Sequence, residues 1–386
     1  MSWTVPVIET AAAGAACAVG AELASRAWLS SRGRYYVWPP HWRAEIQLDP
    51  KGLPWLPPVA RWTINSQGER GAEPPKDWSD TARIVVAGGS TTECYFLDQE
   101  ATWAEQLSGL LNAPGVPQRF GAERVHVGNI GRSVMDAEFQ TTIFEKVLPN
   151  YDRLDLVVLF MGNSEAVRWM HLREAQQYPT QQPPTSHLFG AHPEGPFGWT
   201  PQTLAGRRIA SGLMRRYMNR TDMLERAGKR LAELRARRAN AAHWIEEMSD
   251  PQPLLDHYDE SLRGLLALLK TKAQRVLYIA QPWLDRPLDA EEQLRTWNYG
   301  FGRPYQEVLD TYYRYDVACQ MLNAVRVKGL EVANLCEVDV YDMSGAVPHD
   351  WDHYYDSLHH TPLGNRVVAE RIADRILEAA PHKVLS

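Results

Sequence analysis

Apolar runs alternate with amphipathic segments along most of the chain after residue 80. Strands are predicted where the apolar residues are nearly continuous, and helices where they recur every three or four positions. Strands that are apolar along their whole length are typical of a parallel sheet covered on both faces. The pattern therefore predicts an α/β fold with a doubly wound, flavodoxin-like parallel sheet and helices on both faces. The predicted strands span 82–89, 124–129, 154–162, 275–281 and 331–336, and the predicted helices about 101–112, 134–148, 254–272, 305–328 and 362–379.

A long insertion, 165–253, separates the third and fourth predicted strands. It begins with a loop rich in Pro, Gln and His and continues as a predicted helical stretch over about 203–247. Apolar residues recur there at near-helical spacing, which leaves the arginines on the other face. A solvated lid helix explains this pattern. Contact with an acidic polysaccharide, an anionic lipid or a protein partner is the functional alternative.

Two segments precede the predicted sheet domain, which spans 81–386. Residues 31–80 are rich in Pro and aromatic residues, which predicts an ordered arm or cap with a short strand pair. Residues 1–30 are rich in Ala and Gly, and the stretch 5–29 is long enough to cross a bilayer. Glu9 and Glu22 interrupt that stretch, and no Lys or Arg precedes it as a signal peptide requires. The sequence leaves a membrane-associated helix open and does not distinguish a cytoplasmic from a membrane-associated protein.

Charge and cysteine usage narrow the function classes. The 386-residue chain has a net charge of −6, which argues against general nucleic-acid binding. The segment 207–238 is nevertheless strongly basic, with eleven Lys and Arg against three acidic residues, so it or the stretch 5–29 could contact a membrane or another anionic surface. The four cysteines are scattered and fit buried thiols better than a disulfide framework or a zinc site. They are Cys17, Cys94, Cys319 and Cys336.

Residues with catalytic potential follow the first three predicted strands. Ligands of open parallel sheets bind beyond the carboxyl ends of the strands. Gly88-Gly89-Ser90 ends the first strand, and its glycines permit a sharp turn and close approach of a substrate to the hydroxyl. Gly131 follows the second strand, and Asn163 and Ser164 follow the third, where each could offer a hydrogen-bond donor to an oxyanion. A plain strand-ending turn explains each of these segments equally well when it is taken alone.

The segment 349–372 has the densest set of ionisable residues. Asp356 and His359 stand three positions apart just before the last predicted helix. This spacing can place a carboxylate against one imidazole nitrogen while the other nitrogen faces a nucleophile. Ser90, His359 and Asp356 then supply the nucleophile, the general base and the group that orients the base.

Taken together and in this order, these segments resemble the sequence blocks of the SGNH/GDSL hydrolases, a superfamily of serine esterases and acyl hydrolases. Gly88-Gly89-Ser90 matches the G-D-S block with Gly at the middle position, and Gly131 matches the glycine of the second block. Asp356, His359 and Gly364 match D-x-x-H with a glycine five residues after the histidine. The resemblance covers about 82–379 and implies an acyl-Ser90 intermediate, an oxyanion hole from Ser90, Gly131 and Asn163 or Ser164, and no cofactor or metal.

The third block departs from the family pattern G-x-N-[DE]. Alignment on Gly162 and Glu165 puts Ser164 where the family has Asn, and Asn163 stands one position early. Because side chains alternate at the end of a strand, Ser164 is predicted to point into the site and Asn163 away from it. The departure also favours an alternative function, that of a catalytically weak or inactive carbohydrate-binding or O-acyltransferase protein on the same fold.

The expected partner is a small-molecule or glycan acyl ester. The 14 Trp and 16 Tyr residues, together with the large insertion, favour a carbohydrate O-acyl ester over a long-chain lipid, although rings also serve ordinary packing. A metal-dependent hydrolase is a further alternative, because clusters of His and Asp can bind zinc. The cluster consists of His349, Asp350, Asp352, His353, Asp356, His359 and His360.

Overall fold

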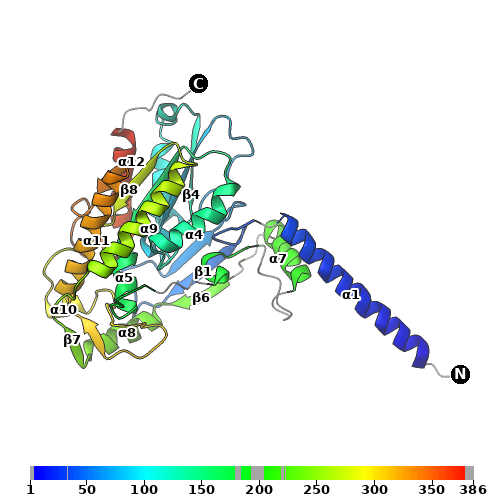
Figure 1. Ribbon diagram of the computed structural model, residues 1–386, viewed down its shortest axis with the longest axis horizontal. Coiled ribbons are helices and arrows are strands. Elements are labelled where there is room, and N and C mark those ends of the chain that lie inside the picture. The colour runs from blue at the N-terminus through cyan, green and yellow to red at the C-terminus, as the bar shows by residue number, and fades with distance from the viewer. Residues whose placement is uncertain are drawn as a thin grey trace.

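The centre of the protein is a five-stranded parallel sheet (Figure 1). The computed structural model describes residues 4–32, 34–178, 184–192, 204–218, 221 and 223–378. The strands lie in the order β10-β8-β5-β3-β4, which is the 2-1-3-4-5 order of flavodoxin-like sheets. The predicted doubly wound sheet is therefore confirmed. Its strands are β3 (Thr81–Gly88), β4 (Arg124–Asn129), β5 (Leu156–Met161), β8 (Val276–Ala280) and β10 (Asp339–Asp342).

Helices cover both faces of this sheet, so successive strand residues enter different cores. Val85 and Leu159 pack with α4 (Ala137–Val147), α9 (Gln252–Lys270) and α11 (Tyr315–Leu335) on one face. Ile84 and Phe160 pack on the other face with α3 (Trp103–Leu111) and α12 (Pro362–Glu378). Burial on both faces explains why the strands are apolar along their whole length. The shorter connecting helices are α2 (Ser90–Glu93), α5 (Asn163–His171), α6 (Thr185–Leu188), α10 (Ala290–Gln293), η1 (Gln99–Ala101), η2 (Pro117–Phe120) and η3 (Leu148–Asn150).

Three predicted elements are wrong. The apolar run 331–336 lies in the last turn of α11 and just beyond it, and the fifth strand is β10. A short apolar run fits the buried side of a helix as well as it fits a strand, so periodicity does not separate the two. The predicted helix 305–328 begins only at Tyr315, after the short strand β9 (Thr311–Tyr313). The helical stretch 203–247 consists of α7 (Ala205–Tyr217), β6 (Met223–Ala227), α8 (Lys229–Ala239) and β7 (His243–Ile245).

The N-terminal arm and the insertion share a second, three-stranded sheet. β1 (Arg43–Leu48) pairs antiparallel with β2 (Val59–Thr63) and parallel with β6. None of the five residues of strand β6 is buried, yet the strand extends this sheet through backbone hydrogen bonds. Strands β7 and β9 form a separate two-stranded parallel pair. Segments that lie far apart in the sequence are therefore joined beside the main sheet.

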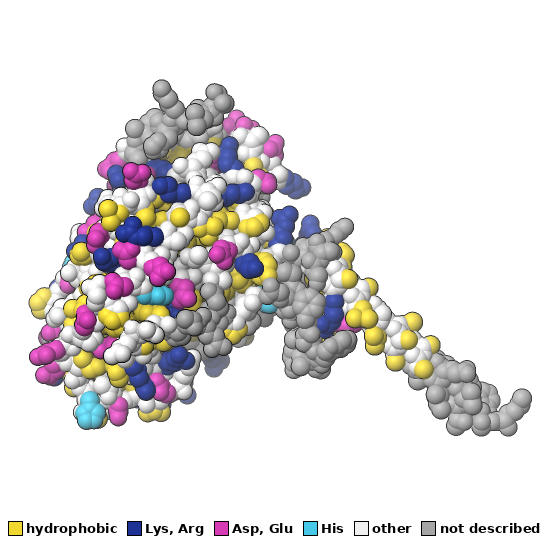
Figure 2. Space-filling model, in the orientation of Figure 1, with side chains coloured by type: hydrophobic (Ala, Val, Ile, Leu, Met, Phe, Trp, Pro, Cys, Tyr) yellow, Lys and Arg dark blue, Asp and Glu magenta, His cyan; other side chains and the backbone are white. Residues whose placement is uncertain are grey.

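Helix α1 (Thr4–Arg32) projects from the body and packs against α7 (Figure 1). Glu22 accepts hydrogen bonds from the amides of Ala205 (2.8 Å) and Gly206 (3.2 Å) at the start of α7 and pairs with Arg26. Hydrophobic side chains lie exposed along the described part of α1 (Figure 2). Of the helices in the described ranges, none combines the length and apolarity that crossing a membrane requires.

Removal of residues 1–30 is expected to leave a folded domain. The main packing partner of α1 is α7, and most of its described side chains are exposed, so the two large cores lose nothing. The thermal midpoint should change by no more than about 2 °C, as for surface changes in general. Circular dichroism melting of the truncated and full chains measures this. An insoluble product, or a much lower midpoint, would show that α1 belongs to the core or to an obligate interface.

Candidate active site

The fold brings Ser90, His359 and Asp356 together at the carboxyl end of the sheet. Ser90 begins α2 directly after β3, and the other two residues lie in the loop between β10 and α12. Ser90 Oγ lies 2.8 Å from His359 Nε2. His359 Nδ1 lies 3.0 Å from Oδ1 and 2.9 Å from Oδ2 of Asp356. All three distances fall within the range of good hydrogen bonds.

Asp356 is held as a buried carboxylate and determines how the imidazole is protonated. Its side chain is 1% exposed, and its Oδ1 accepts the amides of Leu358 (2.8 Å) and His359 (2.9 Å). Burial acts to raise the pKa of this carboxyl, but the charge and hydrogen bond of His359 and the Leu358 amide outweigh burial and lower the pKa. An ionised carboxylate can only accept, so Nδ1 of His359 carries the proton and Nε2 is left to accept from the Ser90 hydroxyl.

The turn that presents Ser90 requires two glycines. Gly88 has φ +156°, and a Cβ on it would overlap the carbonyl oxygen of Phe160 at the end of β5. A Cβ on Gly89 would overlap the hydroxyl oxygen of Ser164. The two positions that depart from the SGNH pattern, 89 and 164, are therefore in contact with each other. Because Gly89 has no side chain, the Ser164 hydroxyl can occupy the space that a Cβ at position 89 would fill.

The buried residue Arg70, from the N-terminal arm, supports the chain that follows Ser90. Its guanidinium donates to the carbonyls of Glu93 (2.6 Å), Cys94 (2.9 Å) and Leu97 (2.7 Å), just beyond α2. It lies 3.9 Å from the ring centroid of Trp62, and burial lowers its pKa to about 10. Sequence reasoning missed this residue, because nothing around position 70 in the sequence signals a contact more than twenty residues away.

The structure does not bring the Gly131 amide into the site. Its N–H donates to Asn129 Oδ1 at 2.8 Å, and a Cβ on this glycine would collide with the backbone of Thr92 and Glu93. Gly131 therefore serves close packing beneath α2. The same loop reaches the site three residues later at Val134, which lines the cavity with φ +60°. A β-branched residue with positive φ is a strained outlier of the kind that clusters at functional sites.

Asn163 and Ser164 both line the cavity, so the expectation that Asn163 faces away is wrong. Strand alternation does not apply, because α5 begins at Asn163 directly after the turn at Gly162. The Asn163 side chain nevertheless directs its amide at the carbonyl of Pro282, at 3.4 Å. Ser164 instead places its hydroxyl against Gly89, next to the nucleophile.

Glu165 joins the two loops that flank the nucleophile. It accepts hydrogen bonds from the amides of Gly162 (3.2 Å) and Ala137 (3.0 Å). Burial and the nearby Asp136 carboxylate raise its pKa to about 8. The loop after β4 and the turn after β5 are therefore fixed relative to each other by one buried side chain.

The site opens into a largely apolar cavity of about 210 Å³. The His359 ring lies between two aromatic rings, Trp297 edge-on at 5.2 Å and Tyr355 stacked at 5.5 Å between centroids. Contacts of this kind limit the rotation of the imidazole. The other rings that line the cavity belong to Tyr95, Phe96 and Tyr305.

The remaining histidines of the cluster are not hydrogen-bonded to Ser90 or Asp356. His353 Nδ1 bonds Asp350 at 2.7 Å, and His349 places its two ring nitrogens 2.8 and 2.9 Å from the carbonyls of Asp285 and Ser344. His360 is 3% exposed, and neither of its ring nitrogens has a hydrogen-bond partner among the described residues. Burial lowers its pKa to about 3, so it is neutral.

The geometry does not support a metal site in this cluster. Within the described residues, the one group with ligand atoms close enough for an ion is Asp136, Glu138 and His257. The Arg168 guanidinium already donates to both of those carboxylates, so their negative charge is balanced by an arginine side chain.

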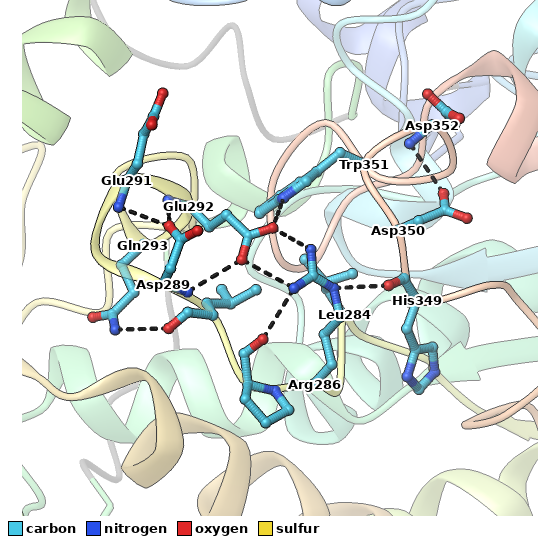
Figure 3. A network of polar contacts seen from close by, with 12 residues as sticks. Leu284, Arg286, Asp289, Glu291, Glu292, Gln293, His349, Asp350, Trp351 and Asp352 are labelled. Carbon is cyan, nitrogen blue, oxygen red and sulfur yellow. Dashed lines mark hydrogen bonds and ion pairs between the residues drawn. The ribbon is translucent and has the colours of Figure 1, made fainter.

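A network of charged residues anchors the loop that carries His359 (Figure 3). Arg286 pairs with Glu292 of α10 and donates to the backbone carbonyl of His349 at 2.9 Å. Glu292 also accepts the indole N–H of Trp351 at 2.8 Å, and these hydrogen bonds lower its pKa to about 2. The loop between β10 and α12 is thus tied to the segment after β8.

Comparison with solved structures gives low-identity likenesses. The acetylxylan esterase Axe2 from Geobacillus stearothermophilus is 11% identical over 78% of this chain and 97% of its own, with a TM-score of 0.43. LAE5, an α/β hydrolase from the metagenome of Lake Arreo, is 14% identical over 78% of this chain and 94% of its own, with a TM-score of 0.41. The aryl esterase of M. smegmatis is 13% identical over 77% of this chain and 99% of its own, with a TM-score of 0.40. TM-scores of this size carry no conclusion about function. No protein-family model and no curated protein matches the chain.

Proposed function

We propose that this protein hydrolyses acyl esters through an acyl-Ser90 intermediate, as an enzyme of the SGNH type. The observation that carries the proposal is the continuous hydrogen-bonded series Ser90–His359–Asp356 beside an apolar cavity. A serine hydroxyl is a weak nucleophile unless a base removes its proton, and His359 Nε2 is in place to do so. The buried Asp356 carboxylate then stabilises the imidazolium that forms.

The reaction proceeds in two steps. Ser90 Oγ attacks the ester carbonyl, its proton passes to His359 Nε2, and the imidazolium returns that proton to the leaving alcohol. Water, deprotonated by the same nitrogen, then attacks the acyl-Ser90 carbonyl. The bond from the acyl carbon to Ser90 Oγ breaks, the imidazolium returns the proton to Oγ, and the acid is released. Asp356 holds the imidazole in one orientation throughout and does not itself take the proton.

The oxyanion donors are assigned to the backbone amide of Ser90, the amide of Val134 and the Ser164 hydroxyl. Val134 replaces Gly131 in this role, because the Gly131 amide is bonded to Asn129 whereas Val134 lines the cavity. The Val134 amide has no hydrogen-bond acceptor among the contacts of the described residues. Asn163 is the less favoured side-chain donor, since its amide is directed at Pro282.

The cavity supports a short acyl group. Its volume of about 210 Å³ holds an acetyl group or a somewhat larger acyl group with room for bound water, whereas a long lipid chain exceeds it. Its aromatic walls suit the apolar part of a small acyl group or the face of a sugar ring. A carbohydrate O-acyl ester is therefore the favoured substrate class.

A second candidate function is acyl transfer to a sugar, or binding without turnover. The specific observation is the Ser164 hydroxyl in place of an amide, because it has a shorter reach toward an oxyanion. Loss of one oxyanion donor typically costs about 3 kcal/mol of transition-state stabilisation.

Replacing the nucleophile tests the proposal most directly. Ser90→Ala should abolish labelling by a fluorophosphonate probe and lower esterase activity by at least about 1,000-fold, because Ser90 is the one described residue whose hydroxyl is hydrogen-bonded to His359. Peptide mapping after labelling identifies the modified residue, and a melting curve should show little change. Ser79→Ala, in an exposed loop before β3, is the matched control and should label normally. Persistent labelling of another residue would contradict the assignment.

Replacing His359 and replacing His360 should affect different properties, the first the catalytic rate and the second the stability of the fold. His359→Ala is expected to lower kcat by orders of magnitude with a small change in melting temperature. His360→Ala removes a buried ring that packs against Tyr354, so it should destabilise the fold by about 1–3 kcal/mol and change the rate much less. Stopped assays with 4-nitrophenyl acetate and urea unfolding measure both effects. Equal rate losses, or the reverse order, would rule out His359 as the base.

The oxyanion assignment makes a prediction about Ser164. Ser164→Asn should raise the acylation rate by about 10- to 100-fold, because a longer amide donor reaches the oxyanion better. Asn163→Ala should have little effect. Single-turnover acylation rates for the two variants provide the measurement. A large loss from Asn163→Ala with no gain from Ser164→Asn would transfer the donor role to Asn163.

A further inference from the structure

A wide groove continues from the catalytic cavity. Its volume is about 990 Å³, and it shares four lining residues with the cavity, so the two form one continuous depression. The shared residues are Ser133, Val134, His171 and Tyr305. A bound ester therefore extends from Ser90 into this groove on the side away from a short acyl group.

Basic side chains predominate among the ionisable residues described along the groove. Three arginines and two histidines contribute to its surface, whereas Asp and Glu are absent from the described residues that line it. This composition contrasts with the acidic chain as a whole, whose net charge is −6. These basic residues are Arg132, Arg168, Arg303, His171 and His187.

Two of the arginines retain their charge for a ligand. Arg168 is neutralised, because its guanidinium pairs with Asp136 and Glu138. Arg132 and Arg303 form no ion pair with any described residue. The nearest acid to Arg132 is the buried Glu93, whose pKa is raised mainly by burial. Arg132 packs on the Trp38 ring and donates to the Val37 carbonyl, which fixes its position.

Arg303 lies near the junction of groove and cavity. Its side chain is exposed, and its charge acts on His171, which lines both spaces. Burial and Arg303 together lower the pKa of His171 to about 4, so this histidine is a neutral hydrogen-bonding group. A substrate that crosses the junction thus meets a neutral imidazole followed by the exposed Arg303 guanidinium. That guanidinium also donates to Gln306 Oε1 at 3.3 Å, and its charge helps to lower the pKa of the Glu307 carboxyl.

We propose that this groove binds the alcohol part of an ester that carries a carboxylate, such as an acylated acidic sugar. The proposal rests on the proposed ester hydrolysis at Ser90 and adds the substrate class. A guanidinium presents paired donors that match the oxygens of a carboxylate. The small apolar cavity offers no cation to an acyl group, so the charge belongs on the alcohol side of the ester.

A matched pair of small esters tests the proposal. The anionic probe 4-acetoxybenzoate and its neutral methyl ester have the same acyl group and similar leaving phenols. The anion should react with a kcat/KM about 3- to 10-fold higher at low salt, and the advantage should shrink with added NaCl. Arg303→Gln should reduce the ratio toward one, Arg303→Lys should keep most of it, and Arg303→Glu should reverse it. Arg371→Gln, on the exposed side of α12, is the control and should leave the ratio unchanged.

A binding measurement separates this proposal from the proposed function. Calorimetry with the Ser90→Ala variant should show tighter binding of 4-acetoxybenzoate than of its methyl ester, and Arg303→Gln in that background should remove the difference. If neither ester is hydrolysed by the native chain but the binding preference remains, the proposed function fails and the anion site stands. If both esters are hydrolysed and bound equally well, the hydrolase stands and the anion site is overturned.

Discussion

The site depends on the close packing of the turn after β3 against the end of β5. Gly88 can approach the Phe160 carbonyl only because it has no side chain and adopts a positive φ. This contact holds Ser90 at the carboxyl edge of the sheet, between the two strands where the strand order reverses. Open α/β sheets bind ligands at such a point, since the connections on either side leave in opposite directions and a crevice remains.

Around this turn, parts of the chain that are distant in sequence hold the nucleophile in place. Arg70 from the N-terminal arm satisfies three carbonyls behind α2, and Glu165 ties the loop after β4 to the turn after β5. On the opposite side, Arg286 and Glu292 anchor the loop that carries His359. A catalytic geometry must be held within a fraction of an ångström, and these charged groups, of which Arg70 and Glu165 are buried, provide rigidity through several directional hydrogen bonds each.

The departure at Ser164 has a local explanation in the fold. An Asp at position 89 would place its Cβ where the Ser164 hydroxyl lies, so the glycine at 89 and the serine at 164 are compatible as a pair. The hydrogen-bonded series Ser90–His359–Asp356 is complete beside this pair, with Asp356 buried and His359 set between two aromatic rings.

The sequence by itself determined the sheet and the order of its functional segments. Continuous apolar runs indicate strands that are buried on both faces. The spacing of Asp356 and His359 can likewise be recognised from the sequence alone. Only the tertiary structure decided which donors reach the cavity. Gly131 is turned under α2, whereas Val134 and Asn163 line the cavity, because helix starts and strained turns override the alternation of a strand. The support from Arg70 and the basic groove with Arg303 likewise arise from contacts between distant segments, which no local pattern of residues encodes.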